Sequence, residues 1–150
     1  MSESELSDQQ LLRYSRQIML PQLDVPGQQR LLDARVLILG AGGLGCPLAL
    51  YLASSGVGHI TIVDDDVVEL SNLQRQILYS DTDVGRLKAE VVCERLAVVN
   101  PEVTVNAICQ RPNPEDLSCL IKEVDLVLDG TDNFTSRYQH NRACIALKKP

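Results

Sequence analysis

Four short stretches of mostly apolar residues recur along the chain, and each is typical of a β-strand. They lie at 36–39, 60–63, 103–107 and 124–128. The first, second and fourth are short apolar runs, as expected of parallel strands that are buried on both faces. The third alternates apolar with polar residues, which indicates a more exposed strand toward an edge of the sheet.

Segments with helical periodicity connect these strands. After the first strand, Leu44, Leu48 and Leu52 repeat every four residues on one helix face, and the helix should end at Gly56. Strands that alternate with helices predict an α/β fold, with a Rossmann-like, doubly wound and mostly parallel sheet and helices on both faces. Three further helices are expected, at about 86–98, at about 115–122, and from the N-cap Asn133 toward 147.

An N-terminal helical extension precedes the first strand. Ser7 and Gln10 fit a capping box at the start of a helix over 8–19. Arg13 and Arg16 share its polar face, which is either a solvated surface or a functional one.

Between this helix and the first strand, Pro26 and Gly27 predict a turn, followed by a short helical piece over 28–32. The chain therefore divides into an N-terminal helical arm, residues 1–34, and a Rossmann-like domain, residues 35–150.

Composition narrows the class of protein. The 150 residues are 45% hydrophobic and 23% charged, enough for one domain with a full core. The net charge of −6 argues against nucleic-acid binding through a broad basic surface. No apolar run approaches the ~20 residues that span a bilayer, so we expect a cytoplasmic protein without a membrane partner. The five cysteines form no C-x-x-C pair and are expected to be free thiols.

A glycine-rich motif follows the first strand. Gly40, Gly42 and Gly45 form G-x-G-x-x-G, in which the glycines permit a tight turn, close approach of a phosphate, and packing of the next helix. The start of that helix would direct its positive dipole end toward a bound anion. Asp64 ends the second strand, where such folds place a carboxylate that binds the ribose. This unit predicts a nucleotide site.

Two later segments offer cations to such a site. Asn72 and Arg75 are three residues apart, so one helical turn would aim both side chains at phosphate oxygens. Lys88 lies in the first turn of a predicted helix, where the dipole disfavours a cation unless an anion lies between them. Taken singly, each of these residues is also typical of a solvated surface.

Asp132 suggests which nucleotide is bound. In the usual strand order 3-2-1-4, the first and fourth strands are neighbours, and this places 129–133 beside the glycine loop. A carboxylate there would repel a polyphosphate unless a cation bridges the two. Mg²⁺ is the common solution, which favours a nucleoside triphosphate over NAD, although Asp132 could also merely belong to a helix cap.

Several motifs together resemble the MoeB/ThiF family, the bacterial relatives of ubiquitin-activating enzymes. These enzymes adenylate the C-terminal glycine of a ubiquitin-like sulfur-carrier protein. The resemblance runs from about Leu6 to Pro150. Its motifs are Arg-Tyr-Ser-Arg-Gln-Ile at 13–18, Gly-Ala-Gly-Gly-Leu-Gly at 40–45, Asp-Asp-Asp at 64–66, Leu-Ser-Asn-Leu-Gln-Arg-Gln at 70–76 and Asp-Gly-Thr-Asp-Asn at 129–133.

The resemblance implies ATP and Mg²⁺ as cofactors, with Asp132 as the metal ligand. It also implies a homodimer, in which Arg16 reaches across to the partner's ATP. The implied nucleotide-binding residues are Gly40, Gly42, Gly43, Gly45, Asp64, Ser71, Asn72, Arg75, Lys88, Asp132 and Asn133. The implied catalytic residues are Arg16, Arg75, Lys88 and Asp132.

Members of this family are longer than this chain. Their second half supplies a carrier-binding surface, a crossover loop and two C-x-x-C pairs that hold structural Zn²⁺, so we expect those features only beyond Pro150 and interpret the chain as the nucleotide-binding half. The motifs do not separate molybdopterin from thiamine biosynthesis. Two other functions remain as alternatives, an NAD-dependent oxidoreductase domain and a non-catalytic interaction module.

Overall fold

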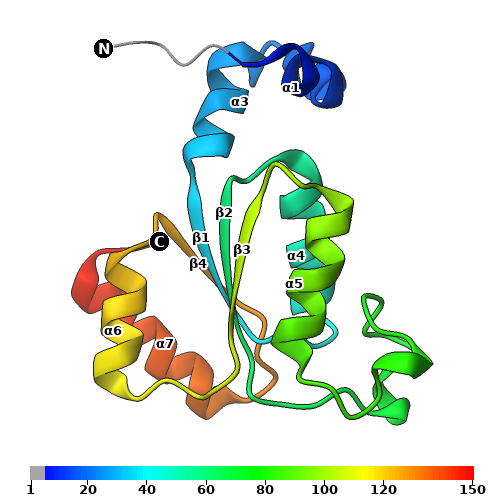
Figure 1. Cartoon of the computed structure of the whole chain (residues 1–150). Helices are drawn as coiled ribbons and strands as arrows, with labels where there is room; N and C mark the ends of the chain where they lie inside the picture. Colours follow the sequence, from blue (N-terminus) through cyan, green and yellow to red (C-terminus); the bar gives the residue numbers. More distant parts are fainter. Residues whose placement is uncertain (1–5) are drawn as a thin grey trace.

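The computed structural model describes residues 6–150 and is built on one four-stranded parallel sheet (Figure 1). The strand order is β3-β2-β1-β4, which confirms the predicted α/β fold and its 3-2-1-4 order. The edge strand β3 has several exposed residues, as its alternating sequence predicts. The bounds are β1 Arg35–Leu39, β2 His59–Val63, β3 Thr104–Ile108 and β4 Leu126–Asp129.

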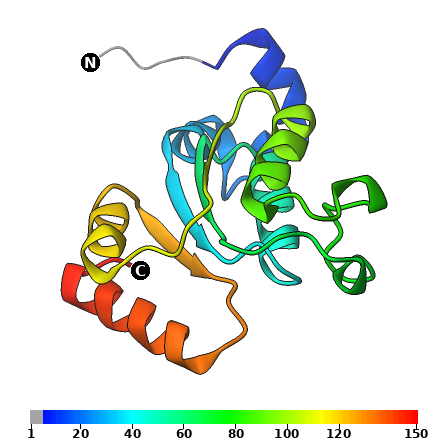
Figure 2. The same ribbon diagram turned by 60° about the horizontal axis from the view of Figure 1, so that its bottom comes forward.

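Helices cover both faces of the sheet, as Figures 1 and 2 show. Ile38 of β1 packs into the core beneath α4 and α5, whereas its neighbour Leu39 packs beside α6 and α7. Successive residues of β1 thus pack into cores on opposite faces of the sheet, which explains why the strand is mostly apolar. The helix bounds are α4 Gly45–Ser55, α5 Lys88–Val99, α6 Pro114–Lys122 and α7 Phe134–Leu147.

The buried face of α4 differs from the predicted leucine stripe. Leu44 precedes the helix and is exposed, Leu48 and Leu52 are partly buried against the core, and the fully buried residues of α4 are Gly45, Cys46, Ala49 and Ala53. Small side chains let the helix axis approach the sheet closely, so contact with β1 selects this face over the leucine repeat. Gly56 ends the helix in a left-handed conformation, as predicted.

The N-terminal arm contains α1 Asp8–Arg13, α2 Ser15–Ile18 and α3 Asp24–Asp33. The predicted capping box of Ser7 and Gln10 is confirmed. The prediction of one helix over 8–19 is wrong, because the helix is interrupted at Tyr14, whose buried hydroxyl accepts a hydrogen bond from Asn100.

The predicted turn at Pro26 and Gly27 is also wrong, since both residues lie inside the first turns of α3. Proline is tolerated there because its missing N–H would have no partner within the helix. Residues 1–5 of the predicted arm lie outside the described residues.

The arm packs at the end of the sheet where the strands begin (Figure 1, top). Gln17 and Gln28 both donate hydrogen bonds to the carbonyl of Ser55, the last residue of α4.

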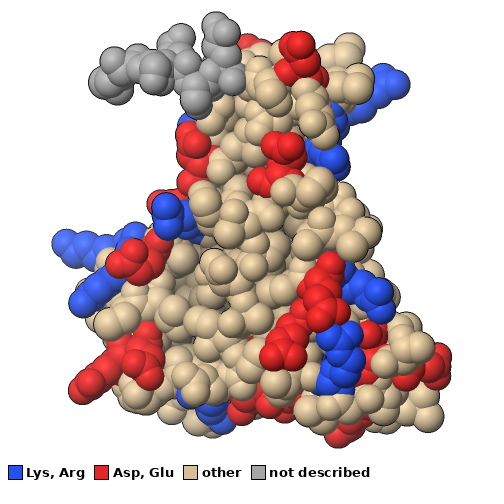
Figure 3. Space-filling view, in the orientation of Figure 1, with Lys and Arg blue, Asp and Glu red and all other residues tan. Residues whose placement is uncertain are grey.

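None of the described helices is long and apolar enough to cross a membrane. On the face drawn in Figure 3, Lys and Arg side chains lie interspersed with Asp and Glu side chains.

Candidate nucleotide site

A cavity of about 650 Å³ opens at the carboxyl ends of the strands, where β1 and β4 lie side by side. This is the crevice in which open α/β sheets bind ligands, because the chain leaves the two neighbouring strands in opposite directions. Eight of the residues singled out from the sequence line it: Gly40, Gly42, Gly43, Asp64, Arg75, Lys88, Asp132 and Asn133.

The glycine loop joins β1 to α4, and its glycines have different roles. Gly40 has φ 94°, and a Cβ there would lie 3.0 Å from the carbonyl carbon of Gly130. A Cβ at Gly45 would lie 1.8 Å from the carbonyl oxygen of Gly40, so Gly45 serves helix packing and does not line the cavity. At Gly42 a Cβ would meet only Gln76 Nε2, at 3.5 Å. Gly42 therefore borders free space into which a ligand fits.

Asp64 ties the end of β2 to the glycine loop. Its carboxylate accepts hydrogen bonds from Ala41 N (2.7 Å) and Asp66 N (2.9 Å). Burial raises the pKa of Asp64, and the two backbone donors partly oppose that rise. Asp64 lines the cavity, and each of its carboxylate oxygens can accept a further hydrogen bond.

The peptide at Ala41 is held from its other side as well. The hydroxyl of Tyr79 (2.6 Å) and the thiol of Cys46 (3.3 Å) both donate to the carbonyl oxygen of Ala41. Burial raises the pKa of both groups, so both remain protonated donors at neutral pH. Sequence reasoning missed Tyr79, because nothing in its local pattern indicates that it reaches the loop 38 residues earlier.

Lys88 begins α5 and is almost fully buried. Its Nζ lies 3.0 Å from the Asp66 carboxylate, and its backbone N–H donates to the Asp66 carbonyl. The anion that the sequence suggested beside Lys88 is thus present as a side chain of the same chain. A phosphate at this end of the cavity would share Lys88 with Asp66.

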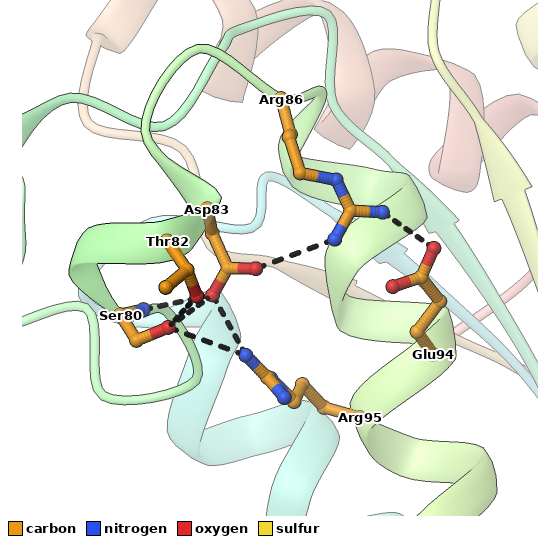
Figure 4. Close-up of polar contacts among 6 residues, drawn as sticks. All are labelled: Ser80, Thr82, Asp83, Arg86, Glu94 and Arg95. Atoms are coloured by element: carbon orange, nitrogen blue, oxygen red, sulfur yellow. Dashed lines mark hydrogen bonds and ion pairs between the residues drawn. The ribbon is translucent and has the colours of Figure 1, made fainter.

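The segment before α5 is anchored by Asp83 in η2 Asp81–Asp83 (Figure 4). The buried carboxylate accepts from the backbone N–H and hydroxyl of Ser80 and from Arg95, and it forms an ion pair with Arg86. Burial opposes ionisation, but these donors prevail and lower the pKa of Asp83 to about 2. A fixed negative charge therefore positions the chain that leads into Lys88.

Arg75, Asn72 and Ser71 do not all point the same way. Arg75 lines the cavity and donates to Asn72 Oδ1 at 3.1 Å, while Ser71 and Asn72 bond to Glu69 and lie outside the lining. Ser71 and Asn72 belong to η1 Leu70–Asn72. Of the three, Arg75 is the one placed to meet a ligand in the cavity.

Asp132 and Asn133 lie between β4 and α7. Among the described residues, no hydrogen bond or ion pair involves the Asp132 carboxylate, which is exposed and lines the cavity. Exposed carboxylate oxygens suit a hard cation such as Mg²⁺. Asn133 caps α7 as predicted, accepting from Ser136 N at 2.8 Å.

The acidic run Asp64–Asp66 brings three carboxylates within 4.8 Å of one another. Asp64 is engaged by backbone amides and Asp66 by Lys88, so the chain itself accounts for two of the three. Asp132 is a better candidate for a metal ligand than Asp64 or Asp66, because its oxygens have no such partner within the described chain.

The lining of the cavity also includes Arg111, Ser136 and His140, which were not predicted from the sequence. His140 Nδ1 lies 2.7 Å from Asp129 Oδ2, and Arg111 donates to the hydroxyl of Ser136. Burial opposes ionisation of Asp129, but hydrogen bonds from Thr131 and His140 hold the pKa of its carboxyl below the usual value. Ser136 and His140 are four apart on α7 and share a helix face, but the sequence does not show that this face borders the cavity.

Arg16 is not part of this cavity. It is exposed on α2, in the arm that packs against the end of α4 far from the glycine loop. Within one chain, the N-terminal arm and the loop that follows β1 lie at opposite ends of the sheet (Figure 1).

These features define a Rossmann-like α/β protein with a glycine-rich loop and a cation-lined cavity at the switch point of its sheet. The family model described as "ThiF family" matches residues 14–150, and the chain belongs to this family.

Two curated relatives from Escherichia coli K12 are closely similar. The chain is 49% identical over 145 residues to the sulfur carrier protein ThiS adenylyltransferase, covering 97% of this chain and 58% of that protein. It is 50% identical over 147 residues to the molybdopterin-synthase adenylyltransferase, covering 98% and 59%. The chain thus spans less than two thirds of the length of these relatives.

Solved structures share the fold. The E. coli tRNA N6-threonylcarbamoyladenosine dehydratase in complex with ATP is 30% identical to this chain, with a TM-score of 0.89. The match covers 96% of this chain and 59% of that one.

Proposed function

We propose that this chain is the nucleotide-binding part of an adenylyltransferase that uses ATP and Mg²⁺ to activate the C-terminal glycine of a ubiquitin-like sulfur-carrier protein. The observation that carries the proposal is the identity of about one half, over nearly the whole chain, to two adenylyltransferases. The cavity supports it, because its lining combines a glycine loop, cations and an exposed carboxylate.

In this proposal ATP lies across the glycine loop. The space at Gly42 admits a phosphate close to the backbone, and Asp64 keeps acceptor capacity for a ribose hydroxyl. Arg75 and Lys88 then neutralise charge on the phosphates. Mg²⁺ held at Asp132 would screen the repulsion between that carboxylate and the polyphosphate.

The reaction is an in-line displacement at the α-phosphorus. A carboxylate oxygen of the carrier's terminal glycine forms a new P–O bond, the bond to the bridging oxygen breaks, and pyrophosphate leaves with that electron pair. Arg75 and Lys88 stabilise the charge that grows on the phosphate oxygens, which is electrostatic catalysis by prearranged donors. No proton needs to be removed from the carboxylate at neutral pH.

We also propose that the protein acts as a homodimer and that Arg16 serves the partner's site. The exposure of Arg16 and its place at the opposite end of the sheet support this arrangement, since it is remote from its own cavity.

The similar identities to the two adenylyltransferases leave molybdopterin and thiamine biosynthesis equally supported. The same relatives favour adenylation over NAD-dependent oxidoreduction.

Isotope exchange between pyrophosphate and ATP tests the proposal. The chain, expressed within its full-length protein, is mixed with ATP, Mg²⁺, labelled pyrophosphate and a sulfur-carrier protein ending in Gly-Gly. Label should enter ATP only when the carrier is present and its C-terminal glycine is intact. Exchange that ignores the carrier, or binding of NAD tighter than ATP in a parallel calorimetric titration, would overturn the adenylation proposal. ATP binding without exchange would leave the chain a non-catalytic module.

A further inference from the structure

Gln76 is a buried amide that the fold leaves unused. It is 3% exposed, yet its Oε1 is buried without a hydrogen-bond partner, and no hydrogen bond among the described residues involves its Nε2. Its backbone is satisfied, since its N–H donates to Asn72 and its carbonyl accepts from Tyr79. Buried polar groups without partners are rare and costly, so the orphan Oε1 shows that the fold does not use this amide. The Nε2 donor, which has no partner among the described residues, can bind an acceptor that a ligand brings.

Gln28 provides a contrast within the same molecule. It is also fully buried, but its Nε2 donates to the carbonyl of Ser55 and its Oε1 accepts from Gln17. Gln28 therefore fastens the arm to α4, which is the ordinary use of a buried amide. Gln76 has no comparable structural task.

The position of Gln76 indicates what its partner is. The side chain lines the cavity, and its Nε2 lies 3.5 Å from where a Cβ at Gly42 would stand. Gly42 is the position at which a phosphate approaches the backbone most closely in this type of loop. Arg75, the preceding residue, also lines the cavity, and its Cδ lies 3.6 Å from where a Cβ at Gly43 would stand.

We infer that Gln76 is a phosphate-binding residue, whose Nε2 donates a hydrogen bond to the phosphate chain of the nucleotide seated over Gly42. The inference rests on the proposed function for the identity of that nucleotide. A phosphate offers only acceptor oxygens, so it selects the NH₂ end of the amide. Gln76 adds a neutral donor to the cations of Arg75 and Lys88, at a point where a carboxylate would be repelled.

Two nearly isosteric variants test this role by calorimetric titration with MgATP. Gln76→Met removes the donor and should weaken binding about tenfold, in line with loss of one hydrogen bond to a charged group. Gln76→Glu replaces the donor by a negative charge and should weaken binding by about a hundredfold or more. Gln74→Met, at an exposed glutamine in the same segment, is the matched control and should bind like the wild type.

A second measurement separates ligand binding from a structural role. Without ligand, Gln76→Met should unfold at the same temperature as the wild type or higher, because it removes an unpartnered buried amide. A lower unfolding temperature without ligand, or MgATP affinity of Gln76→Glu equal to that of the wild type, would overturn the inference.

The outcome is independent of the adenylation proposal. If MgATP affinity decreases from wild type to Gln76→Met to Gln76→Glu while carrier-dependent exchange is absent, the phosphate contact stands and the proposed function fails. If exchange occurs and Gln76→Glu binds MgATP as tightly as the wild type, the adenylation proposal stands and Gln76 is not a phosphate ligand.

Discussion

Lys88 and Asp66 form an ion pair 3.0 Å long whose two ends lie in different surroundings. The Lys88 side chain is 6% exposed, whereas that of Asp66 is 70% exposed. The buried cation therefore depends on this carboxylate when no ligand is present. Asp66 is exposed, so it loses little free energy when water replaces Lys88 as its partner. Binding of a phosphate would exchange one anionic partner of Lys88 for another.

Replacement of Asp66 should accordingly trade stability for affinity. Asp66→Asn leaves a buried lysine without its counter-ion, and we expect the free energy of unfolding to fall by about 1–3 kcal/mol. MgATP should bind several-fold more tightly, since Lys88 is no longer shared. Urea unfolding and calorimetry measure the two effects. Asp65→Asn, which removes a neighbouring charge that has no partner within the described chain, controls for the general change in electrostatic potential. An equal gain in affinity in both variants would contradict the sharing of Lys88.

The glycine loop allows binding to be separated from folding. Gly42→Ala adds a methyl group that meets only Gln76 Nε2 at 3.5 Å, an ordinary contact, so the fold should survive. The same methyl group fills the space of closest phosphate approach, and MgATP binding should be lost. Circular dichroism and calorimetry together test this expectation.

Gly45→Ala is the matched control for that experiment. Its Cβ would lie 1.8 Å from the Gly40 carbonyl oxygen, so the variant should unfold at a much lower temperature. If Gly42→Ala is as unstable as Gly45→Ala, the space at Gly42 belongs to the fold and not to a ligand.

Asp132 is expected to carry the dependence of nucleotide binding on Mg²⁺. Its exposed carboxylate has no partner within the described chain and lies beside the glycine loop. Asp132→Asn removes the repulsion of phosphate along with the metal ligand, so binding of ATP in EDTA should improve while the gain from added Mg²⁺ largely disappears. Titrations with and without Mg²⁺ check this, and a Mg²⁺ dependence like that of the wild type would place the metal elsewhere.

The sequence predicts the sheet well because its signals are local. The apolar run 36–39, the glycine loop and the acid at Asp64 each follow from a few neighbouring residues, and the strand order follows from the usual topology of such folds. The face of α4 was misjudged because the sheet selects small residues such as Ala49 over a more regular leucine repeat.

The parts of the site that escaped prediction depend on contacts between distant segments. Tyr79 reaches Ala41 across 38 residues, and Asp66 meets Lys88 across 22. A helical spacing placed Asn72 and Arg75 side by side, but it could not show that they would bond to each other and leave only Arg75 in the cavity lining. Competition among polar partners is settled by the folded chain and not by spacing.

The buried carboxylate of Asp83 should make stability depend on acid pH. Its pKa is about 2 in the folded chain and 3.8 in its ordinary state, so the ionised form stabilises the fold above about pH 4. That contribution is lost as the pH falls from about 4 toward 2. Asp83→Asn should lower the free energy of unfolding by about 1–3 kcal/mol at pH 6.

Urea unfolding of wild type and Asp83→Asn at pH 6 and pH 3 measures this effect, and the difference between them should shrink at the lower pH. Asp81→Asn, at an exposed aspartate two residues earlier, should show little difference at either pH. A gap between wild type and Asp83→Asn that is as wide at pH 3 as at pH 6 would assign the loss to packing and not to charge.

The position of Arg16 leads to a test of catalysis between subunits. Arg16 belongs to the arm, which packs against the end of α4 that is remote from the glycine loop, so in the proposed dimer its effect on the reaction comes through the partner's cavity. Arginines supplied in this way to phosphoryl transfer can be worth about 10³–10⁵ in rate. In the full-length protein, Arg16→Ala and Asp132→Ala should therefore each be nearly inactive in carrier-dependent exchange.

Mixing the two inactive variants should restore part of the activity. A heterodimer of Arg16→Ala with Asp132→Ala contains one site that lacks both groups and one site that lacks neither. Random exchange of subunits makes half of the dimers mixed, so activity should return to roughly a quarter of the wild-type value per site. The double variant Arg16→Ala/Asp132→Ala, mixed with wild type, provides the control, because each site of that heterodimer lacks one group. A mixture of the single variants that stays inactive after subunit exchange has been verified would mean that Arg16 does not act across the dimer.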